Sequence, residues 1–374
     1  MDKKRNKKIL ILQNELSPYN VPVYNRIAAE FDLTVGFYQK DKSKQECSFQ
    51  KKFFKTIQIG SLTFIKGLRR YAKDFDLVST IPDMHVVSYC LLPFLPHKYK
   101  LTNWSIGFRV SYYHPYLTNR KHVPADRIFQ CILAHCDASI FYMEKAKEFW
   151  NGTSLDMNKV FVAPNTTDVL PIEINSEKKR NFLFVGTLYK GKGLDLLLQS
   201  YKEATDVADV DNELHIVGDG EERKNIEAFV KTNHLEGKVI LHGAIFDEEV
   251  LSQQFANALL CISPAQGGLS VPKSMGYGVP FVTKTTAITG GEIYHIASGV
   301  NGIMYENDYE LSEILIDAAN HPEKYIEMGR KAKDYYDNSA TINHMANGAM
   351  AAFRFALGEQ MKKEIDSDSF RDYK

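Results

Sequence analysis

Residues 182–193 read FLFVGTLYKGKG, and this stretch decides the fold of the second half of the chain. An apolar run typical of a buried strand, 182–186, ends in a glycine-rich turn, and a helix with apolar periodicity follows from Leu194. The same order of strand, turn and helix then recurs, which indicates a parallel α/β sheet. We predict helices over 194–204, 221–233 and 248–258, and strands over 214–218, 239–243, 259–263 and 302–305.

The first half of the chain shows the same alternation in a less regular form. Its polar end, TTDVLPIEINSEKKR at 166–180, has no periodicity and predicts a linker. The length of 374 residues suits two domains. In the first half we predict strands over 8–13, 33–38, 77–81, 100–106, 138–143 and 160–163, and helices over 21–31 and 125–135. The predicted divisions are an N-terminal domain (1–168), a linker (169–180), a C-terminal domain (181–340), and a C-terminal helix and tail (341–374).

Composition places the chain among folded proteins. Hydrophobic residues make up 44% and charged residues 25%, which excludes global disorder. The cysteines are odd in number, dispersed and without a CxxC pair, so we expect reduced core thiols and neither a zinc site nor redox chemistry. They are Cys47, Cys90, Cys131, Cys136 and Cys261.

Two further features favour a cytoplasmic location. The start, MDKKRNKKILILQ, has a basic run before a short apolar segment without a small-residue cleavage site, so we expect a first strand and no signal peptide. The strongest apolar stretch, 86–96, contains two prolines, and at about 11 residues it is shorter than the roughly 20 that cross a bilayer.

Charge is unevenly distributed although the net formal charge is zero. Residues 1–170 hold about 25 Lys and Arg against about 15 Asp and Glu, including a basic cluster at 3–8. A basic first half suits a surface that meets anionic lipid at the inner face of the cell membrane, or a phosphate-bearing acceptor. Electrostatic attraction between the two domains is an equally good explanation. We expect no nucleic-acid partner.

Four glycine-bearing loops in the second half predict a phosphate site. They lie at 186–193, 218–220, 267–270 and 290–291. Ligands of open parallel sheets bind at the carboxyl ends of the strands, where backbone amides point at negative charge. The alternatives are plain strand-to-helix turns and solvated surface lysines. The predicted donor-binding residues are Gly186, Thr187, Lys190, Lys192, Gly218, Gly220, Gly267, Gly268, Leu269, Ser270 and Lys273.

At these residues the chain resembles glycosyltransferase family 4. The family's G-R-L and K-G of the first loop resemble Gly186-Thr187-Leu188 and Lys192-Gly193, and its I-x-G-x-G-P resembles the stretch 216–221. The later pattern P-S-x-x-E-G-F-G-L-x-x-x-E-A-M-A-x-G-x-P-V resembles 264–281, and V-x-x-x-P-N resembles 160–165. The match spans nearly the whole second half and is weaker before residue 150.

The resemblance implies a GT-B fold and a retaining, metal-independent reaction. Two Rossmann-like domains would face each other across a cleft, the first binding the acceptor and the second the nucleotide-sugar, with the C-terminal helix returning to the first. It implies no cofactor, with a UDP- or GDP-linked sugar as co-substrate. The leaving diphosphate would help to take the acceptor's proton, so the main task of the enzyme would be to stabilise charge on that group.

This chain departs from the family at residues that bear on the mechanism. The paired glutamates of the family fall on Ala265 and Lys273, and Thr187 replaces the usual phosphate-binding arginine. Lys273 would pair with phosphate or with the carboxylate of an acidic donor sugar. In the loop after the strand at 100–106, where the family often has a histidine, the candidates for a catalytic role are Arg109 and His114.

The loop after the first strand, 14–20, would touch the acceptor in a GT-B cleft. Its candidate residues are Ser17, Tyr19 and Asn20, and we expect Asn20 to cap the helix that follows. The leading hypothesis is a hexosyl or deoxyhexosyl transferase of bacterial surface polysaccharide assembly, with a saccharide acceptor that is lipid-linked or soluble. The alternatives are a GT-B nucleotide-sugar epimerase and a catalytically degenerate protein that binds nucleotide-sugar.

Overall fold

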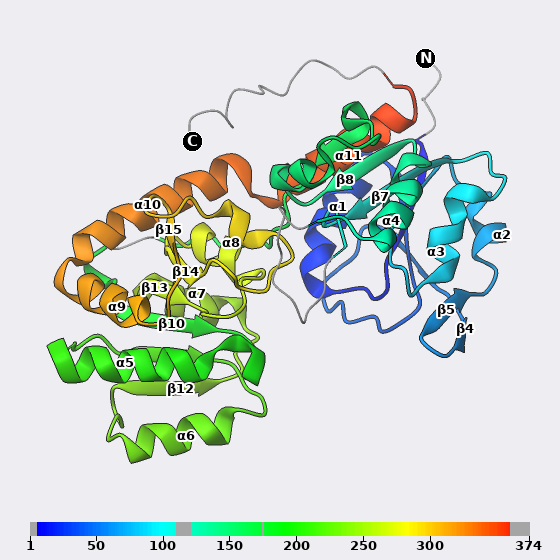
Figure 1. Ribbon diagram of the computed structural model, residues 1–374. Coiled ribbons are helices and arrows are strands. Elements are labelled where there is room, and N and C mark those ends of the chain that lie inside the picture. Colours follow the sequence, from blue (N-terminus) through cyan, green and yellow to red (C-terminus); the bar gives the residue numbers. More distant parts are fainter. Residues whose placement is uncertain (1–5, 110–120, 174–175, 209, 360–374) are drawn as a thin grey trace. The chain divides into compact units, whose positions relative to one another are not determined.

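The computed structural model describes residues 6–109, 121–173, 176–208 and 210–359 (Figure 1). The described residues form two compact units. Unit 1 contains residues 6–109, 121–165 and 342–359, and unit 2 contains the described residues of 166–341. The segment 169–180, which the sequence predicts as a linker, falls within unit 2.

Unit 1 is built on a parallel sheet with the strand order β3-β2-β1-β6-β7-β8-β9. A separate antiparallel hairpin, β4 with β5, follows β3 in the chain. The strands are β1 Lys8–Leu12, β2 Asp32–Phe37, β3 Gln50–Phe53, β4 Thr56–Ile59, β5 Leu62–Ile65, β6 Leu77–Thr80, β7 Lys100–Ser105, β8 Ala138–Phe141 and β9 Val160–Val162. The long helices are α1 Val21–Ala28 and α4 Pro124–Ala134, with shorter ones at α2 Leu68–Ala72 and α3 Val87–Leu91.

The last described helix, α11 Ile342–Ala356, completes the core of unit 1. It contacts α1, β8 and β9, and Phe31 packs edge-on against Phe353 at 6.2 Å between ring centroids. Gly348 permits this close packing, because a Cβ there would lie 2.1 Å from the carbonyl oxygen of Val162. The predicted return of the C-terminal helix to the first domain is confirmed, and Figure 1 shows α11 lying along β8.

Unit 2 has a second parallel sheet, with the order β12-β11-β10-β13-β14-β15. Apolar residues of α5, α6 and α9 cover one set of strand side chains, and those of α7, α8 and α10 take part in a second cluster. The strands are β10 Asn181–Val185, β11 Leu214–Val217, β12 Val239–Gly243, β13 Ala258–Ile262, β14 Phe281–Lys284 and β15 Gly302–Tyr305. The helices are α5 Leu194–Ala208, α6 Arg223–Thr232, α7 Glu248–Asn257, α8 Ser270–Gly276, α9 Glu310–Asn320 and α10 Pro322–Ser339.

Each sheet reverses its strand order at one point, between β1 and β6 in unit 1 and between β10 and β13 in unit 2. In doubly wound sheets this switch point leaves a crevice outside the carboxyl ends of the two strands, and ligands bind there. The prediction of two Rossmann-like α/β sheets is confirmed. The loops that matter most are therefore those that follow β1, β6, β10 and β13.

The cysteines are free thiols, as predicted, but they are not all in the core. Cys136 and Cys261 are buried, and burial raises the pKa of both to about 12. Cys131 is exposed because it lies on the outer face of α4. The prediction that Cys131 is a core thiol is therefore wrong.

Candidate functional site

Two glycines allow the loops after β10 and β11 to pack directly on each other. Gly218 has a φ of 153°, and a Cβ built there would lie 1.9 Å from the carbonyl oxygen of Gly186. A Cβ on Gly220 would lie 2.3 Å from the carbonyl oxygen of Leu188, whose amide donates to Asp219 O at 3.0 Å. A side chain at either glycine would push the loops apart. The absence of side chains at Gly218 and Gly220 thus allows the two loops to lie in direct contact.

The loop after β13 is held between the loops after β10 and β14. The amide of Ala265 donates to Lys192 O at 3.3 Å, and the amide of Gly267 donates to Ile288 O at 3.0 Å. Gly267 is needed for this packing, because a Cβ there would lie 2.3 Å from Cγ2 of Ile293. The glycine-bearing loops after β10, β11, β13 and β14 therefore form one continuous cluster, which we call the switch-point cluster.

Gly268 and Leu269 expose backbone at the edge of this cluster. No atom lies within 4 Å of a Cβ built on Gly268. Within the described part of the chain, the amides of Gly268 and Leu269 have no hydrogen-bond acceptor. Ser270, which follows them, is half-buried and begins α8. Unused amides beside open space are ready donors for an anion.

The side chain of Lys192 folds back over its own turn. Its Nζ lies 3.5 Å from the position of a Cβ on Gly186 and 5.7 Å from the centroid of the Tyr189 ring. Burial lowers the pKa of the Lys192 ammonium, and the charge of Glu292 acts in the opposite direction. No hydrogen-bond or ion-pair acceptor for Nζ is found among the described residues. A half-buried ammonium with three unused N–H donors favours binding of an anion.

Glu292 is a residue of this cluster that the sequence analysis missed. Its side chain is buried, and Oε2 accepts hydrogen bonds from the Gly290 amide at 2.7 Å and from Thr289 Oγ1 at 2.9 Å. Its negative charge helps to keep Lys192 protonated in spite of burial. The signal in the sequence was a carboxylate placed directly after the glycine pair 290–291.

Lys273 already has a carboxylate partner. Its Nζ donates to both carboxylate oxygens of Glu248, at 2.6 and 2.7 Å, and Tyr277 OH donates to Glu248 Oε1 at 2.8 Å. Lys273 is the residue at which the family pattern has a glutamate. Here the carboxylate comes instead from the first turn of α7, and the lysine neutralises it. An extra phosphate or sugar carboxylate at Lys273 would have to share the ammonium with Glu248.

Thr187 and Lys190, two further predicted donor residues, lie in the loop after β10 together with Lys192. Thr187 and Lys190 are exposed, and Lys190 begins the short 3₁₀ segment Lys190–Lys192. Tyr189, between them, donates a hydrogen bond from its hydroxyl to Gln266 in the loop after β13. The two lysines of the turn thus differ in environment, since Lys192 is half-buried and Lys190 is surrounded by solvent.

In unit 1, the loop after β1 lies at the other switch point. Ser17 is buried, and its hydroxyl donates to Glu15 Oε1 at 2.9 Å, while Tyr19 is 44% exposed. The expectation that Asn20 caps α1 through its side chain is wrong, because that side chain makes no capping hydrogen bond. A 3₁₀ turn, Pro18–Asn20, runs directly into the helix, and the Pro18 carbonyl already accepts a hydrogen bond from the first amide of the helix, that of Val21.

Of the two residues predicted to have a catalytic role, the structure describes Arg109. Arg109 Nη1 lies 3.7 Å from Oδ1 of Asp126, whose side chain is fully buried. This carboxylate also accepts from the Val123 amide at 2.8 Å and so fixes the start of α4. The side chain of Arg109 is about one-third exposed. His114 lies outside the described residues.

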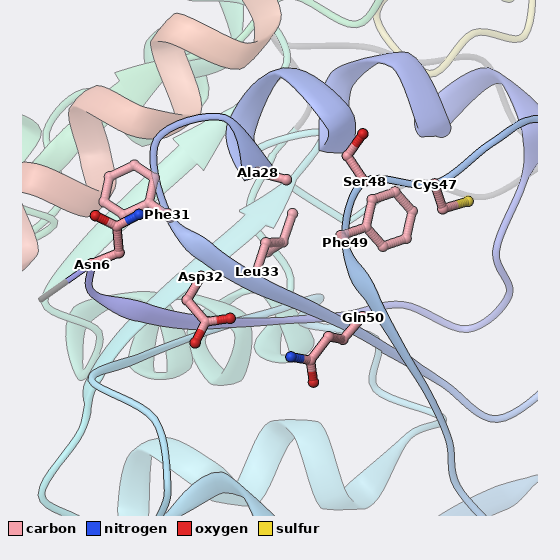
Figure 2. Close-up of a pocket in the computed structure, with 9 residues that line it drawn as sticks. All are labelled: Asn6, Ala28, Phe31, Asp32, Leu33, Cys47, Ser48, Phe49 and Gln50. Atoms are coloured by element: carbon pink, nitrogen blue, oxygen red, sulfur yellow. The ribbon is translucent and has the colours of Figure 1, made fainter.

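A separate pocket of about 640 Å³ lies in unit 1, away from both switch points (Figure 2). It is lined by Asp32 and Gln50, the first residues of β2 and β3, together with Phe31 and Phe49. This is the amino-end edge of the sheet. Loops at the carboxyl ends, not this edge, carry ligands in folds of this kind.

The described residues hold neither a metal-binding cluster nor a membrane-spanning helix. No group of three His, Cys, Asp or Glu side chains is arranged there to hold a metal ion. None of the helices in the described ranges is both long enough and apolar enough to cross a bilayer.

The switch-point cluster falls inside a segment that is similar to a known family. Residues 179–321 match the model of the family described as glycosyl transferases group 1. Over these residues the chain is similar to group 1 glycosyltransferases. The matched segment runs from the strand β10 to the helix α9 and includes each loop of the cluster. The predicted resemblance to family 4 is confirmed.

A similar sequence is also described as a glycosyltransferase. An uncharacterized glycosyltransferase of Methanocaldococcus jannaschii is 30% identical over 165 residues, which are 43% of this chain and 44% of that protein. The matched stretch therefore spans less than half of the relative's length.

Solved structures cover nearly the whole chain. Anabaena HepE in complex with UDP is 15% identical with a TM-score of 0.70, covering 92% of this chain and 99% of that one. The lipopolysaccharide outer core galactosyltransferase WaaB is 16% identical with a TM-score of 0.65, again covering 92% and 99%. Both show that this chain has the GT-B fold.

Proposed function

We propose that this protein is a retaining glycosyltransferase that moves a hexose or deoxyhexose from a UDP- or GDP-linked sugar to a saccharide acceptor, without a metal ion. One observation carries the proposal. Lys192 is a half-buried ammonium without a hydrogen-bond or ion-pair acceptor among the described residues, and it lies at the switch point of the segment that is similar to group 1 glycosyltransferases. A diphosphate supplies the charge that this ammonium lacks.

The described residues suit the departure of a nucleoside diphosphate. The bond between the anomeric carbon and the β-phosphate oxygen breaks, a bond to the acceptor oxygen forms, and the acceptor's proton passes to the leaving diphosphate. Lys192 and the amides of Gly268 and Leu269 stabilise the negative charge that grows on that group. Because these donors are already in place, little reorganisation is needed in the transition state.

For the acceptor we propose a saccharide of bacterial surface polysaccharide assembly, linked to lipid and reached from the inner face of the cell membrane. The similarity in fold to WaaB, named as a lipopolysaccharide outer core galactosyltransferase, supports this class. In the basic cluster at 3–8, Lys7 Nζ lies 3.8 Å from Asp76 Oδ1, so the charge of this lysine is partly neutralised. Residues 3–5 lie outside the described residues.

The test is a series of nucleotide measurements on the purified protein. Calorimetry with UDP and with GDP is expected to show binding of one of them, and thermal shift with nucleotide-sugars identifies the donor, because a ligand of the folded state raises its stability. Incubation with this donor and a lipid-linked saccharide is expected to release nucleoside diphosphate. Conversion of the donor without any acceptor would instead show an epimerase. Binding without turnover on any acceptor would show a degenerate nucleotide-sugar-binding protein, for which the Lys273–Glu248 pair is the structural argument.

A further inference from the structure

The hairpin of β4 and β5 presents an apolar face to solvent. Ile57 pairs with Phe64 and Ile59 pairs with Leu62, so these four side chains share one face. Ile57, Ile59 and Leu62 are 47%, 64% and 40% exposed. In Figure 1 the hairpin lies at one extremity of unit 1, beside α3.

The opposite face of the hairpin attaches it to unit 1. Thr63 and Ile65 are buried there. The Thr63 amide donates to His85 O at 2.7 Å, and the Ile65 amide donates to Ser88 Oγ at 2.8 Å. The hairpin is thus anchored on one side, and its apolar face on the other side has no cover in the described part of the chain. An apolar face kept exposed in this way is typical of an interaction surface.

Cations surround the base of this face. From 47 to 73 the sequence holds seven Lys and Arg and no Asp or Glu. Lys55 and Lys66 meet where the hairpin begins and ends, since the Lys66 amide donates to Lys55 O at 2.8 Å, and α2 then adds Arg69 and Arg70. Lys55, Lys66 and Arg70 are exposed, and no ion-pair partner for them is found among the described residues.

We propose that this hairpin docks the protein on an anionic lipid bilayer. The side chains of Ile57, Ile59 and Leu62 enter the boundary between headgroups and acyl chains, and Lys55 and Lys66 lie at the level of the lipid phosphates. Stable attachment to a membrane surface needs two signals, and here apolar side chains combine with basic ones.

A bilayer fits these observations better than a protein partner. The exposed apolar residues lie on one face of a two-stranded hairpin, so they suit a soft lipid surface into which they can insert. A second copy of the chain would bring the same cations together and would be repelled. The proposal rests on the proposed function for a membrane-borne acceptor, while its test measures lipid binding alone.

The experiment is vesicle co-sedimentation of the full chain. We expect binding to vesicles of phosphatidylcholine mixed with phosphatidylglycerol, little binding to pure phosphatidylcholine, and a decrease with added salt. The variant Ile57→Ser/Ile59→Ser/Leu62→Ser is expected to lower the partition coefficient by about tenfold or more. Lys55→Gln/Lys66→Gln is expected to lower it several-fold. Val207→Ser, at an exposed apolar residue of unit 2, is the matched control and keeps full binding.

UDP and GDP calorimetry on the same variants separates this proposal from the proposed function. Unchanged nucleotide affinity with lost vesicle binding supports the hairpin surface. The proposal is overturned if the wild-type chain ignores anionic vesicles, or if the triple variant binds them as well as the wild type does. It is equally overturned if light scattering shows a wild-type dimer that the triple variant abolishes, because the occupant is then a second copy.

Discussion

The two switch points of this molecule share a strand topology, and they differ in the residues that form their loops. In unit 2 the loops are lined by glycine, and backbone lies next to backbone, as where Gly218 meets Gly186. In unit 1 the loop from 13 to 20 has no glycine, and side chains make the contacts. Asn14 Nδ2 donates to Asp83 Oδ2 at 3.0 Å, and Tyr89 OH donates to Gln13 O at 2.8 Å.

This difference suggests a division of labour. A diphosphate is common to UDP- and GDP-linked sugars, and backbone amides with one lysine recognise it without contacting the sugar. An acceptor differs from one enzyme to the next, and side chains such as Tyr19 can be exchanged without disturbing the sheet beneath them. We therefore expect substitutions in unit 2 to act on folding and nucleotide affinity, and those in the unit 1 loop to act on acceptor use.

The largest effect is expected for Gly218→Ala. The new Cβ would lie 1.9 Å from Gly186 O, at a φ of 153° that side chains rarely adopt. We expect a loss of about 3 kcal/mol or more in the free energy of unfolding, measured by urea denaturation. Gly268→Ala is the control, since nothing lies within 4 Å of its Cβ, and it is expected to keep wild-type stability. Equal stabilities of the two variants would contradict the close packing of these loops.

Lys192→Met is expected to weaken UDP or GDP binding by about 1 to 3 kcal/mol through the loss of a charge-assisted contact. Lys190→Met, in the same turn but exposed, is expected to change the affinity little. Because burial lowers the pKa of Lys192, nucleotide affinity should fall as the pH rises through that lowered pKa and the ammonium loses its proton. Calorimetry over a pH series checks both points. A pH profile shared by wild type and Lys192→Met would reject the assignment.

A smaller effect is expected at the Lys273–Glu248 pair. A double-mutant cycle with Lys273→Met and Glu248→Gln should give a coupling in stability of about 1 kcal/mol, because the pair is bidentate but partly exposed. The same cycle on nucleotide affinity sharpens the role of the lysine. If Lys273 mainly neutralises Glu248, Glu248→Gln leaves a spare cation and does not weaken nucleotide binding. A large loss of affinity in Glu248→Gln would instead place the carboxylate on the ligand.

The smallest effect on the nucleotide is expected for Tyr19→Ala. This side chain is 44% exposed and lies in unit 1, so we expect UDP affinity within about 0.5 kcal/mol of wild type. The KM for the acceptor should rise several-fold in transfer assays, with Tyr19→Phe as the conservative control. Should the substitution lower nucleotide affinity as strongly as Lys192→Met does, the division of labour between the two loops would be wrong.

Much of the fold follows from local patterns, and the parts that do not have physical reasons. The strands 182–186 and 214–218 and the helix from Leu194 were predicted within a few residues, because apolar periodicity and glycine turns mark them. The β4–β5 hairpin was missed because its apolar residues face outward, against the usual pattern. The strand β14 was missed because it has four residues and follows Pro280 directly.

The candidate site was only partly visible in the sequence. Lys192 and the glycines stand out because they lie close together in the chain. Glu292 does not, since it is 100 residues from the lysine whose pKa it influences. The Lys273–Glu248 pair spans 25 residues and two helices, so only the folded chain reveals that the lysine is neutralised. Partners brought together by tertiary packing are beyond local patterns.

The helix α11 has a consequence for synthesis on the ribosome. The body of unit 1 leaves the exit tunnel first, but the buried residues Met345, Met350 and Phe353 are translated last. Unit 2 therefore has all of its residues 166–341 before unit 1 has its own. We expect a chain that ends at Thr341 and has been released from the ribosome to show a protease-resistant unit 2 next to a digestible unit 1. In this protein, synthesis of unit 1 therefore begins before that of unit 2 and is completed after it.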